Sequence, residues 1–198
     1  MRIDLKHVAD FVEDNARVLD LGCGDGKLLE YLQESKSIRG YGVERDQDAI
    51  ESCIQRGVNV IEHDLNSGLD RFPDDSFDIV VMTETLQALE SPRTLLRELL
   101  RIANRCIVSF PNFGHWRCRF QLLFRGRMPV AEHLPHAWYN TPNIHLCTFR
   151  DFDEMCQLEK LEVVERSVID PKYRKVTSKS ALSNLFGTTG FYVLGRGK

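Results

Sequence analysis

The 198-residue sequence predicts an α/β fold in which a mostly parallel sheet carries helices on both faces. Strand and helix patterns alternate through the first 110 residues, as expected when helices connect parallel strands. A glycine-rich turn at 22–26 separates the first strand from the helix that follows it. Acidic residues end three successive strands. Together these features are typical of a fold that binds a nucleotide-like ligand at one edge of its sheet.

The elements of the first half are expected in a regular order. A short opening helix spans about 3–15, and its apolar stripe contains Leu5, Val8, Phe11 and Val12. Strands follow at 18–21, 38–44 and 58–64, with helices at 27–34 and 46–56 between them. Asp46 is placed as an N-cap, and Gly57 ends the second of these helices.

The second half continues the pattern and then changes it. A fourth strand is expected at 77–83, a helix opened by Pro92, and a fifth strand at 105–110. A further helix is expected near 149–158. Strands at 161–169 and 190–194 complete the sheet as an antiparallel hairpin, which brings the expected number of strands to seven.

The charges around the glycine turn indicate the kind of ligand. Its spacing is Gly-x-Gly-x-Gly, whereas dinucleotide folds usually have Gly-x-Gly-x-x-Gly. Asp20 and Asp25 flank the turn, and carboxylates there would repel a pyrophosphate. They would suit a ligand that carries an ammonium and a sulfonium group, such as S-adenosylmethionine. The glycine pattern alone is a weak signal, because a structural turn can have the same sequence.

Two more acids strengthen this interpretation. Glu44 ends the second strand, where an acid can accept hydrogen bonds from ribose hydroxyls. Asp64 ends the third strand, where it can accept from an adenine amino group. Any one of these acids alone is most often a solvated strand end. Acids at the carboxyl ends of three successive strands favour an adenosyl ligand.

The segments 20–26 and 77–82, together with Glu44 and Asp64, resemble the successive motifs of class I S-adenosylmethionine-dependent methyltransferases over about residues 15–110. The resemblance implies the three-layer, Rossmann-like fold of that class. It also implies S-adenosylmethionine or S-adenosylhomocysteine as the cofactor. The residues expected to bind the cofactor are Asp20, Gly22, Cys23, Gly24, Asp25, Gly26, Glu44, Arg45, Asp64, Leu65 and Thr83.

Two later stretches, 109–116 and 138–148, resemble the MetW family of bacterial methionine-biosynthesis proteins, over essentially the whole chain. This resemblance implies a cytoplasmic partner of homoserine O-acyltransferase. The leading hypothesis is therefore a cofactor-binding subunit with little or no methyl transfer that supports or regulates the acyltransferase. The alternative is an active methyltransferase on a small molecule or a protein.

The sequence identifies no catalytic residue. The Asn/Asp-Pro-Pro-Tyr/Phe motif of amide- and amine-directed methyltransferases is absent after the fourth strand. Glu84 or His115 could act as a base. A helix-start acid and a packed imidazole are the simpler interpretations of these two residues.

The segment 111–147 is long for one connection, and such loops are often functional. It contains four of the six histidines and both tryptophans. Trp116, Arg117, Trp138 and Tyr139 are expected to form a partner-contact surface, because Trp, Tyr and Arg are common in binding hot spots. A packed cap is the structural alternative. The spacings of His133, His136, His145 and Cys147 match no zinc signature, so no metal site is expected.

Composition excludes several classes of protein. The formal charge of −3 gives no electrostatic footprint for nucleic acid. The six cysteines include no Cys-x-x-Cys pair, which favours reduced thiols in the cytoplasm. The first six residues lack the apolar core of a signal peptide, and the longest aliphatic run, 79–82, is too short to span a bilayer. The length fits one domain, 1–198, with an insert at about 111–147.

Overall fold

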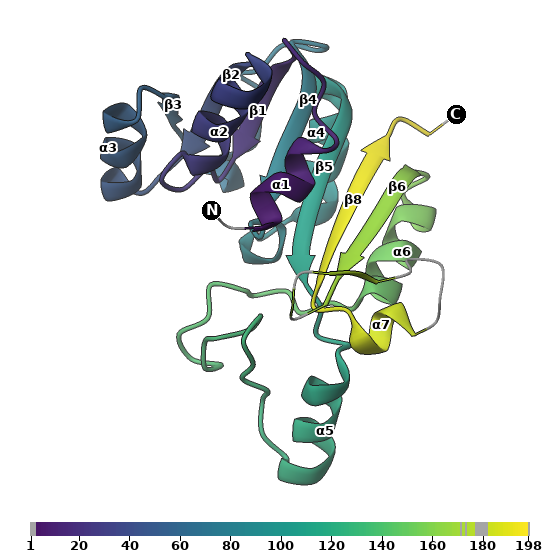
Figure 1. Cartoon of the computed structure of the whole chain (residues 1–198). Coiled ribbons are helices and arrows are strands. Elements are labelled where there is room, and N and C mark those ends of the chain that lie inside the picture. Colours follow the sequence, from purple (N-terminus) through teal and green to yellow (C-terminus); the bar gives the residue numbers. More distant parts are fainter. Residues whose placement is uncertain (1–2, 171, 173, 177–181, 198) are drawn as a thin grey trace.

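An eight-stranded mixed sheet forms the centre of the computed structural model, which describes residues 3–170, 172, 174–176 and 182–197 (Figure 1). The strand order is β3-β2-β1-β4-β5-β8-β6-β7. The strands are β1 (Arg17–Leu21), β2 (Arg39–Glu44), β3 (Asn59–Glu62), β4 (Phe77–Thr83), β5 (Ala103–Pro111), β6 (Glu162–Ile169), β7 (Lys175–Val176) and β8 (Thr189–Gly195).

The sheet is parallel from β3 to β5 and changes direction at its C-terminal strands. β8 pairs antiparallel with β5 on one side and with β6 on the other. β7 adds two residues at the edge of β6. The predicted α/β class, with seven principal strands and an antiparallel C-terminal pair, is confirmed.

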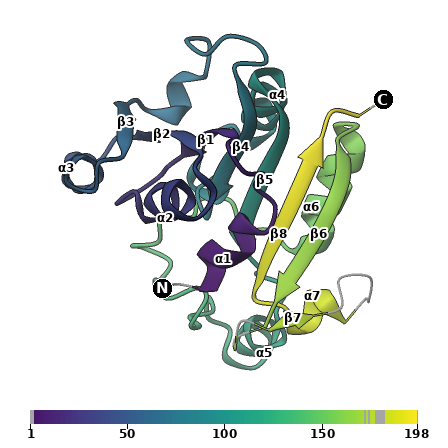
Figure 2. The same ribbon diagram turned by 45° about the horizontal axis from the view of Figure 1, so that its top comes forward.

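Helices cover both faces of the sheet (Figure 2). The principal helices are α1 (Ile3–Ala9), α2 (Lys27–Lys36), α3 (Gln47–Gln55), α4 (Pro92–Ile102), α5 (Trp116–Arg125), α6 (Phe149–Leu158) and α7 (Ser183–Phe186). Alternate residues of the strands supply the two apolar layers, as the pleat requires. Val18 packs with Leu29 and Leu32 of α2 in one layer, and Leu19 packs with Leu96 and Leu99 of α4 in the other.

Local signals explain where several helices begin and end. The Asp46 side chain accepts a hydrogen bond from Ala49 N at 3.0 Å and caps α3, and Gly57 follows with φ +72°. Pro92 occupies the first turn of α4, where its missing N–H costs nothing. Thr148 and Asp151 form a reciprocal capping box at the start of α6.

The opening helix is shorter than the pattern predicted. α1 ends at Ala9, and Phe11 N and Val12 N continue as tight turns to Val8 O and Ala9 O. Val8 and Val12 are still buried, because the turns keep both on the sheet side. Asn15 then adopts φ +60° and redirects the chain into β1. The side chain of Leu5 lies outside the described residues.

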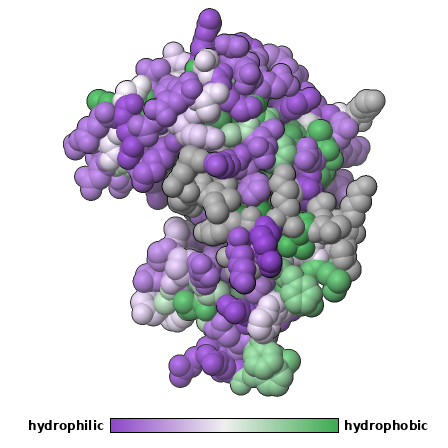
Figure 3. All heavy atoms as spheres, viewed as in Figure 1, coloured by the Kyte–Doolittle hydropathy of each residue, from purple (hydrophilic) through white to green (hydrophobic). Residues whose placement is uncertain are grey.

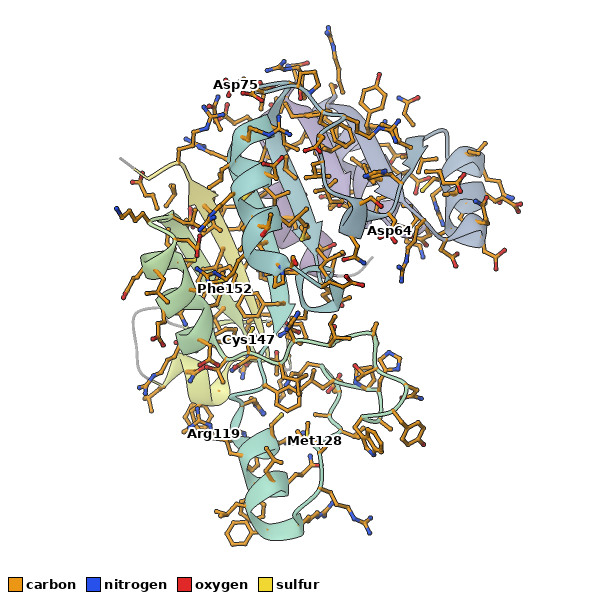
Figure 4. The ribbon with its side chains drawn as sticks, turned by 180° about the vertical axis from the view of Figure 1, so that it is seen from behind. Asp64, Asp75, Arg119, Met128, Cys147 and Phe152 are labelled. Atoms are coloured by element: carbon orange, nitrogen blue, oxygen red, sulfur yellow. The ribbon has the colours of Figure 1, made fainter. Side chains whose placement is uncertain are left out.

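The segment between β5 and α6 projects from the carboxyl ends of the parallel strands (Figure 1). It contains α5 and a long irregular return. Figure 4 shows Cys147 where this insert rejoins the sheet, and Arg119 and Met128 further out. Within the described part of the chain, no helix combines the length and hydropathy needed to cross a membrane.

Candidate functional site

The carboxyl ends of β1 to β4 surround a cavity of about 190 Å³. This is the edge at which open parallel sheets bind ligands. Figure 4 shows Asp64 at this edge, following β3. The cavity is lined by Gly22, Val43, Glu44, Arg45, His63, Asp64, Leu65, Asn66, Glu84, Thr85, Ala88 and Leu89.

Asp20 is a buried acid beside the glycine turn, at the penultimate position of strand β1. Its side chain is only 1% exposed, and Oδ1 has no hydrogen-bond partner within the described residues. Burial, with a smaller contribution from the charge of Glu44, raises the pKa of Asp20 to about 7. A buried acceptor with no partner is costly in the protein alone, so this group is suited to a polar or cationic ligand.

The glycine turn brings the backbone close to the segment that follows β4. Gly22 has φ +73°, and its N–H donates to Val43 O at 2.8 Å. A Cβ at this position would lie 2.5 Å from Thr85 Oγ1, so only glycine fits without displacement of Thr85. Cys23 points into the protein, with its Sγ 3.8 Å from Cys53 Sγ, and burial raises the pKa of the Cys23 thiol.

Glu44 ties the end of β2 to the glycine turn. Its Oε2 accepts from Gly24 N at 3.0 Å, and its Oε1 accepts from Arg45 N and Asp46 N at 2.7 and 3.1 Å. These bonds fix the carboxylate at the cavity wall. Each oxygen can accept a further bond, so Glu44 can still receive hydroxyl donors from a ligand.

Asp64 lines the cavity after the neighbouring strand β3. Its Oδ1 accepts from Asn66 N at 3.0 Å and caps the short 3₁₀ turn Leu65–Ser67, and its Oδ2 lies 3.7 Å from Arg45 Nη1. Leu65 is buried beside it and presents an apolar surface. The structure therefore brings together Gly22, Glu44, Arg45, Asp64 and Leu65, as the sequence predicted.

Six predicted residues do not line this cavity: Asp20, Cys23, Gly24, Asp25, Gly26 and Thr83. Asp25 forms ion pairs with Lys27 and Arg56. Gly26 caps α2 with φ +76°. Thr83 ends β4 directly before the lining residues.

The segment after β4 contains lining residues that were not predicted to bind the cofactor, although Glu84 was considered as a possible base. Glu84 adopts φ +57°, an uncommon conformation for a non-glycine residue. Its N–H donates to Ser109 O at 2.9 Å, which fixes the turn against β5. Thr85, Ala88 and Leu89 follow it along the cavity. The position of these residues directly after the fourth strand was the sequence feature that could have identified them.

Gln87 connects this segment to the insert. Its backbone oxygen accepts from Ile144 N and His145 N, both at 2.9 Å. Its side-chain Nε2 donates to Cys147 Sγ at 3.2 Å and lies 3.4 Å from Pro111 O. Gln87 therefore connects the segment that lines the cavity to both ends of the insert.

The insert exposes large apolar side chains. Trp138 and Tyr139 are 73% and 74% exposed and pack edge to face at 5.8 Å. Trp116 is also exposed, with the guanidinium of Arg117 stacked 5.4 Å from its ring centroid. Figure 3 shows hydrophobic side chains on this projecting part of the molecule. The exposure of the three aromatic side chains contradicts the packed-cap alternative, in which they would be buried.

Behind this surface the insert encloses a second, mainly apolar cavity of about 430 Å³. Its lining residues include Phe113, Met128, Leu134, Trp138 and Ile144. His115 lines neither cavity.

His115, Cys118 and His133 meet at the base of the insert. One ligand-type atom from each lies within 4.8 Å of the others. Burial, with smaller contributions from the nearby His133 and Arg117, lowers the pKa of His115 to about 4. Burial also lowers the pKa of His133 and raises that of the Cys118 thiol to about 11. Within the described residues, His136, His145 and Cys147 form no such group with His133.

A comparison with protein families gives one match across nearly the whole chain. The model of the family described as methionine biosynthesis protein MetW matches residues 2–194. A bifunctional methionine biosynthesis protein MetXA/MetW from Rhodopirellula baltica is 36% identical over 173 residues. That match covers 83% of this chain but only 27% of the relative, so the chain spans about a quarter of the relative's length.

Solved structures share the fold at low identity. A methyltransferase from Mesorhizobium loti that depends on S-adenosylmethionine has a TM-score of 0.71 and 15% identity, with 98% of each chain covered. One from Thermotoga maritima has a TM-score of 0.67 and 18% identity, with 98% of this chain and 87% of that chain covered. The [4+2]-cyclase SpnF has a TM-score of 0.68 and 16% identity, with 98% and 80% covered. The fold is therefore shared by proteins with different reactions.

Proposed function

The chain belongs to the family of the methionine biosynthesis protein MetW, and from this premise we propose that it binds S-adenosylmethionine or S-adenosylhomocysteine. We further propose that it acts as a cytoplasmic subunit that associates with homoserine O-acyltransferase and supports or regulates it. The observation that carries the cofactor proposal is the buried, unpartnered carboxylate of Asp20 beside the glycine turn.

Asp20 would place a negative charge opposite the cationic groups of the cofactor. S-adenosylmethionine carries an ammonium and a sulfonium group, and an ionised carboxylate in a buried site attracts a cation strongly. A bound cation would stabilise the ionised form and so offset the burial that raises the pKa of Asp20. The half-buried Gly22 and Gly24, which have no side chain, would allow the methionine part to approach the backbone closely.

The walls of the cavity match the remaining groups of the ligand. The fixed carboxylate of Glu44 would accept hydrogen bonds from the ribose hydroxyls. Leu65 would pack against the adenine ring, and Asp64 would accept from its amino group. Arg45 Nη1 lies 3.7 Å from Asp64 Oδ2 and partly balances the charge of that carboxylate. When bound, the cofactor would supply a methyl group activated by the sulfonium.

The cofactor proposal is tested by calorimetry with S-adenosylhomocysteine, which is chemically stable. Asp20→Asn and Glu44→Gln should each weaken binding at least tenfold, because the first removes the buried, unpartnered carboxylate beside the glycine turn and the second removes a carboxylate that lines the cavity. Asp78→Asn is the matched control: its carboxylate is paired with Arg17 near the start of β4, away from the carboxyl ends of the strands, and does not line the cavity. Equal affinity for all four proteins would contradict the proposal.

The partner proposal rests on family membership and on the insert. The Rhodopirellula baltica relative carries MetXA and MetW in one polypeptide, which favours physical association of the two activities. The exposed side chains Trp116, Arg117, Trp138 and Tyr139 form the proposed contact surface. Exposed aromatic residues with a stacked arginine are typical of interface hot spots.

Gln87 provides a physical route between the cofactor and this surface. Ala88 and Leu89 line the cavity, and Gln87 directly precedes them in the chain. Gln87 forms hydrogen bonds with Ile144, His145 and Cys147 of the insert. A ligand that shifts the cavity wall would therefore shift the insert. Such a subunit could report the level of the cofactor to the acyltransferase, provided that the cofactor binds the free and complexed forms differently.

Association is tested by co-purification with homoserine O-acyltransferase and by acyl transfer measured with and without the chain. The double variant Trp138→Ala/Tyr139→Ala should lose association, whereas Ile54→Ala, an exposed residue of α3, should retain it. Titration of S-adenosylmethionine and S-adenosylhomocysteine then gives the sign of the regulation. Unchanged association of the double variant would rule out the proposed surface.

Glu84 gives the alternative function a specific basis. Its strained φ places an acid at the cavity edge, and strained residues are frequent at active sites. Incubation with cofactor labelled in the methyl group and with cell extract tests methyl transfer. Label transfer that Glu84→Gln and Asp20→Asn both abolish would favour an active methyltransferase over the subunit.

A further inference from the structure

We propose that His115, Cys118 and His133 bind one zinc ion, which fastens the returning loop of the insert to the start of α5. This site lies apart from the cofactor cavity and does not depend on the function proposed above. None of the three residues lines that cavity.

The backbone explains how the three side chains meet. His115 is the N-cap of α5, and Cys118 lies three positions later, on the same side of the helix. His133 comes from the loop that returns from the tip of the insert, next to the isolated bridge between Ala131 and Leu134. The two ends of a 14-residue stretch, 119–132, are thus held at one point.

The distances are close to those of a coordinated ion. Cys118 Sγ lies 3.9 Å from His133 Nε2, and all three ligand atoms fall within 4.8 Å of one another. Ordinary Zn–S and Zn–N lengths place such atoms about 3.6 Å apart in a tetrahedral site. Small side-chain rotations would therefore bring the three atoms around an ion.

Burial distinguishes this group from a surface cluster. His115 is 1% exposed and Cys118 is fully buried, yet His115 Nε2 has no hydrogen-bond partner within the described residues. A buried ring nitrogen that lacks a partner in the protein is costly. Coordination of an ion would satisfy it.

The remaining polar contacts of the group are weak or replaceable. His115 Nδ1 accepts a long bond, 3.4 Å, from Arg117 N, and His133 Nε2 lies 3.2 Å from Asn112 O. Coordination through Nε2 would place the proton of each neutral ring on Nδ1, so the long bond from Arg117 N and the contact with Asn112 O would both be exchanged for two Zn–N bonds. Both imidazoles are then neutral, as metal binding requires.

One thiolate and two neutral imidazoles are a ligand set typical of zinc, which takes sulfur and nitrogen in tetrahedral geometry. The step involves no redox change. Cys118 loses its thiol proton to solvent as the Zn–S bond forms, so binding of each ion releases one proton. Three protein ligands leave a fourth position for a water molecule.

A zinc ion here would order the insert. Leu134 and Met128, close to His133 in the chain, line the apolar cavity of about 430 Å³ together with Trp138. The ion would hold this loop against α5 and so fix the position of the exposed aromatic residues.

Metal binding is tested on the purified full chain. Titration with Zn²⁺ against a chromophoric chelator should show one site. Co²⁺ in its place should give a thiolate-to-metal charge-transfer band, and calorimetry in two buffers should show release of about one proton. Cys118→Ser should abolish the band and weaken Zn²⁺ binding at least tenfold. Cys147→Ser and His136→Asn, which change other residues of the insert, should leave both unchanged.

A second variant keeps the test decisive if Cys118→Ser does not fold. His133→Gln changes a half-buried loop residue, and circular dichroism establishes whether its fold is intact. Absence of a stoichiometric site in the unmodified chain would overturn the proposal. So would Zn²⁺ binding by folded His133→Gln or Cys118→Ser with unchanged affinity.

Discussion

Replacement of Asp20 by asparagine should make folding less sensitive to pH while it removes cofactor binding. The unfolded chain loses this proton near the ordinary pKa of 3.8, whereas the folded chain loses it near 7. Between these values the folded state binds more protons, so the stability of the unmodified protein falls as pH rises. The full shift in the pKa of Asp20, from 3.8 to about 7, corresponds to a free energy of about 4 kcal/mol.

Urea denaturation at pH 5 and pH 8 measures the effect. Linkage gives a loss of about 3 kcal/mol from Asp20 over this interval, and the asparagine variant should lack that loss. Any cost of the buried amide is independent of pH, so the diagnostic quantity is the change with pH in the difference in stability between the two proteins. S-adenosylhomocysteine binding by the unmodified chain should also strengthen from pH 6 to pH 8.

Asp78→Asn supplies a control of opposite sign. Arg17 lowers the pKa of Asp78, so the stability due to this pair is present above the ordinary pKa and lost in acid. The pair is half exposed and should contribute at most about 1 kcal/mol. If the difference between the unmodified protein and Asp20→Asn is the same at pH 5 and pH 8, the account of Asp20 as a buried, uncompensated acid is refuted.

Gly22→Ala should lower the free energy of unfolding by about 1–3 kcal/mol, because the new Cβ combines a positive φ with a close contact against Thr85. The same variant should weaken S-adenosylhomocysteine binding at least tenfold. Gly57→Ala has a similar φ but open space, so calorimetry should show unchanged binding; equal loss in both variants would contradict the close-approach argument. Phe152→Ala removes a buried ring from α6 and should cost about 3–5 kcal/mol in urea denaturation. Leu158→Ala, on the same helix but exposed, should change stability by less than about 0.5 kcal/mol, and similar values for the two would show that α6 does not pack as described.

The fold followed from local patterns because its signals are short-range. Asp46, Gly57 and Pro92 each act within one helical turn, so their roles could be predicted from neighbouring residues. The alternation of strands and helices then fixed the parallel order. The end of α1 was predicted too late, since the positive φ of Asn15 depends on the path into β1 rather than on the apolar stripe.

The candidate site was predictable where it followed the ends of strands and not where it depended on packing. Glu44 and Asp64 were located from their positions alone, and both line the cavity. The burial of Asp20 depends on the neighbouring strands, which no local pattern reveals. His115 and Cys118 were separated from His133 by a whole loop, so only the folded chain shows that they meet.

The bond from Phe113 N to Cys147 O, 3.1 Å long, closes the neck of the projecting segment. Because the chain leaves β5 and enters α6 at nearly the same point, this segment can be exchanged as one unit. A short glycine bridge in its place would leave the strands connected, and grafting the segment onto another protein of this fold would present the proposed contact surface without the rest of this chain.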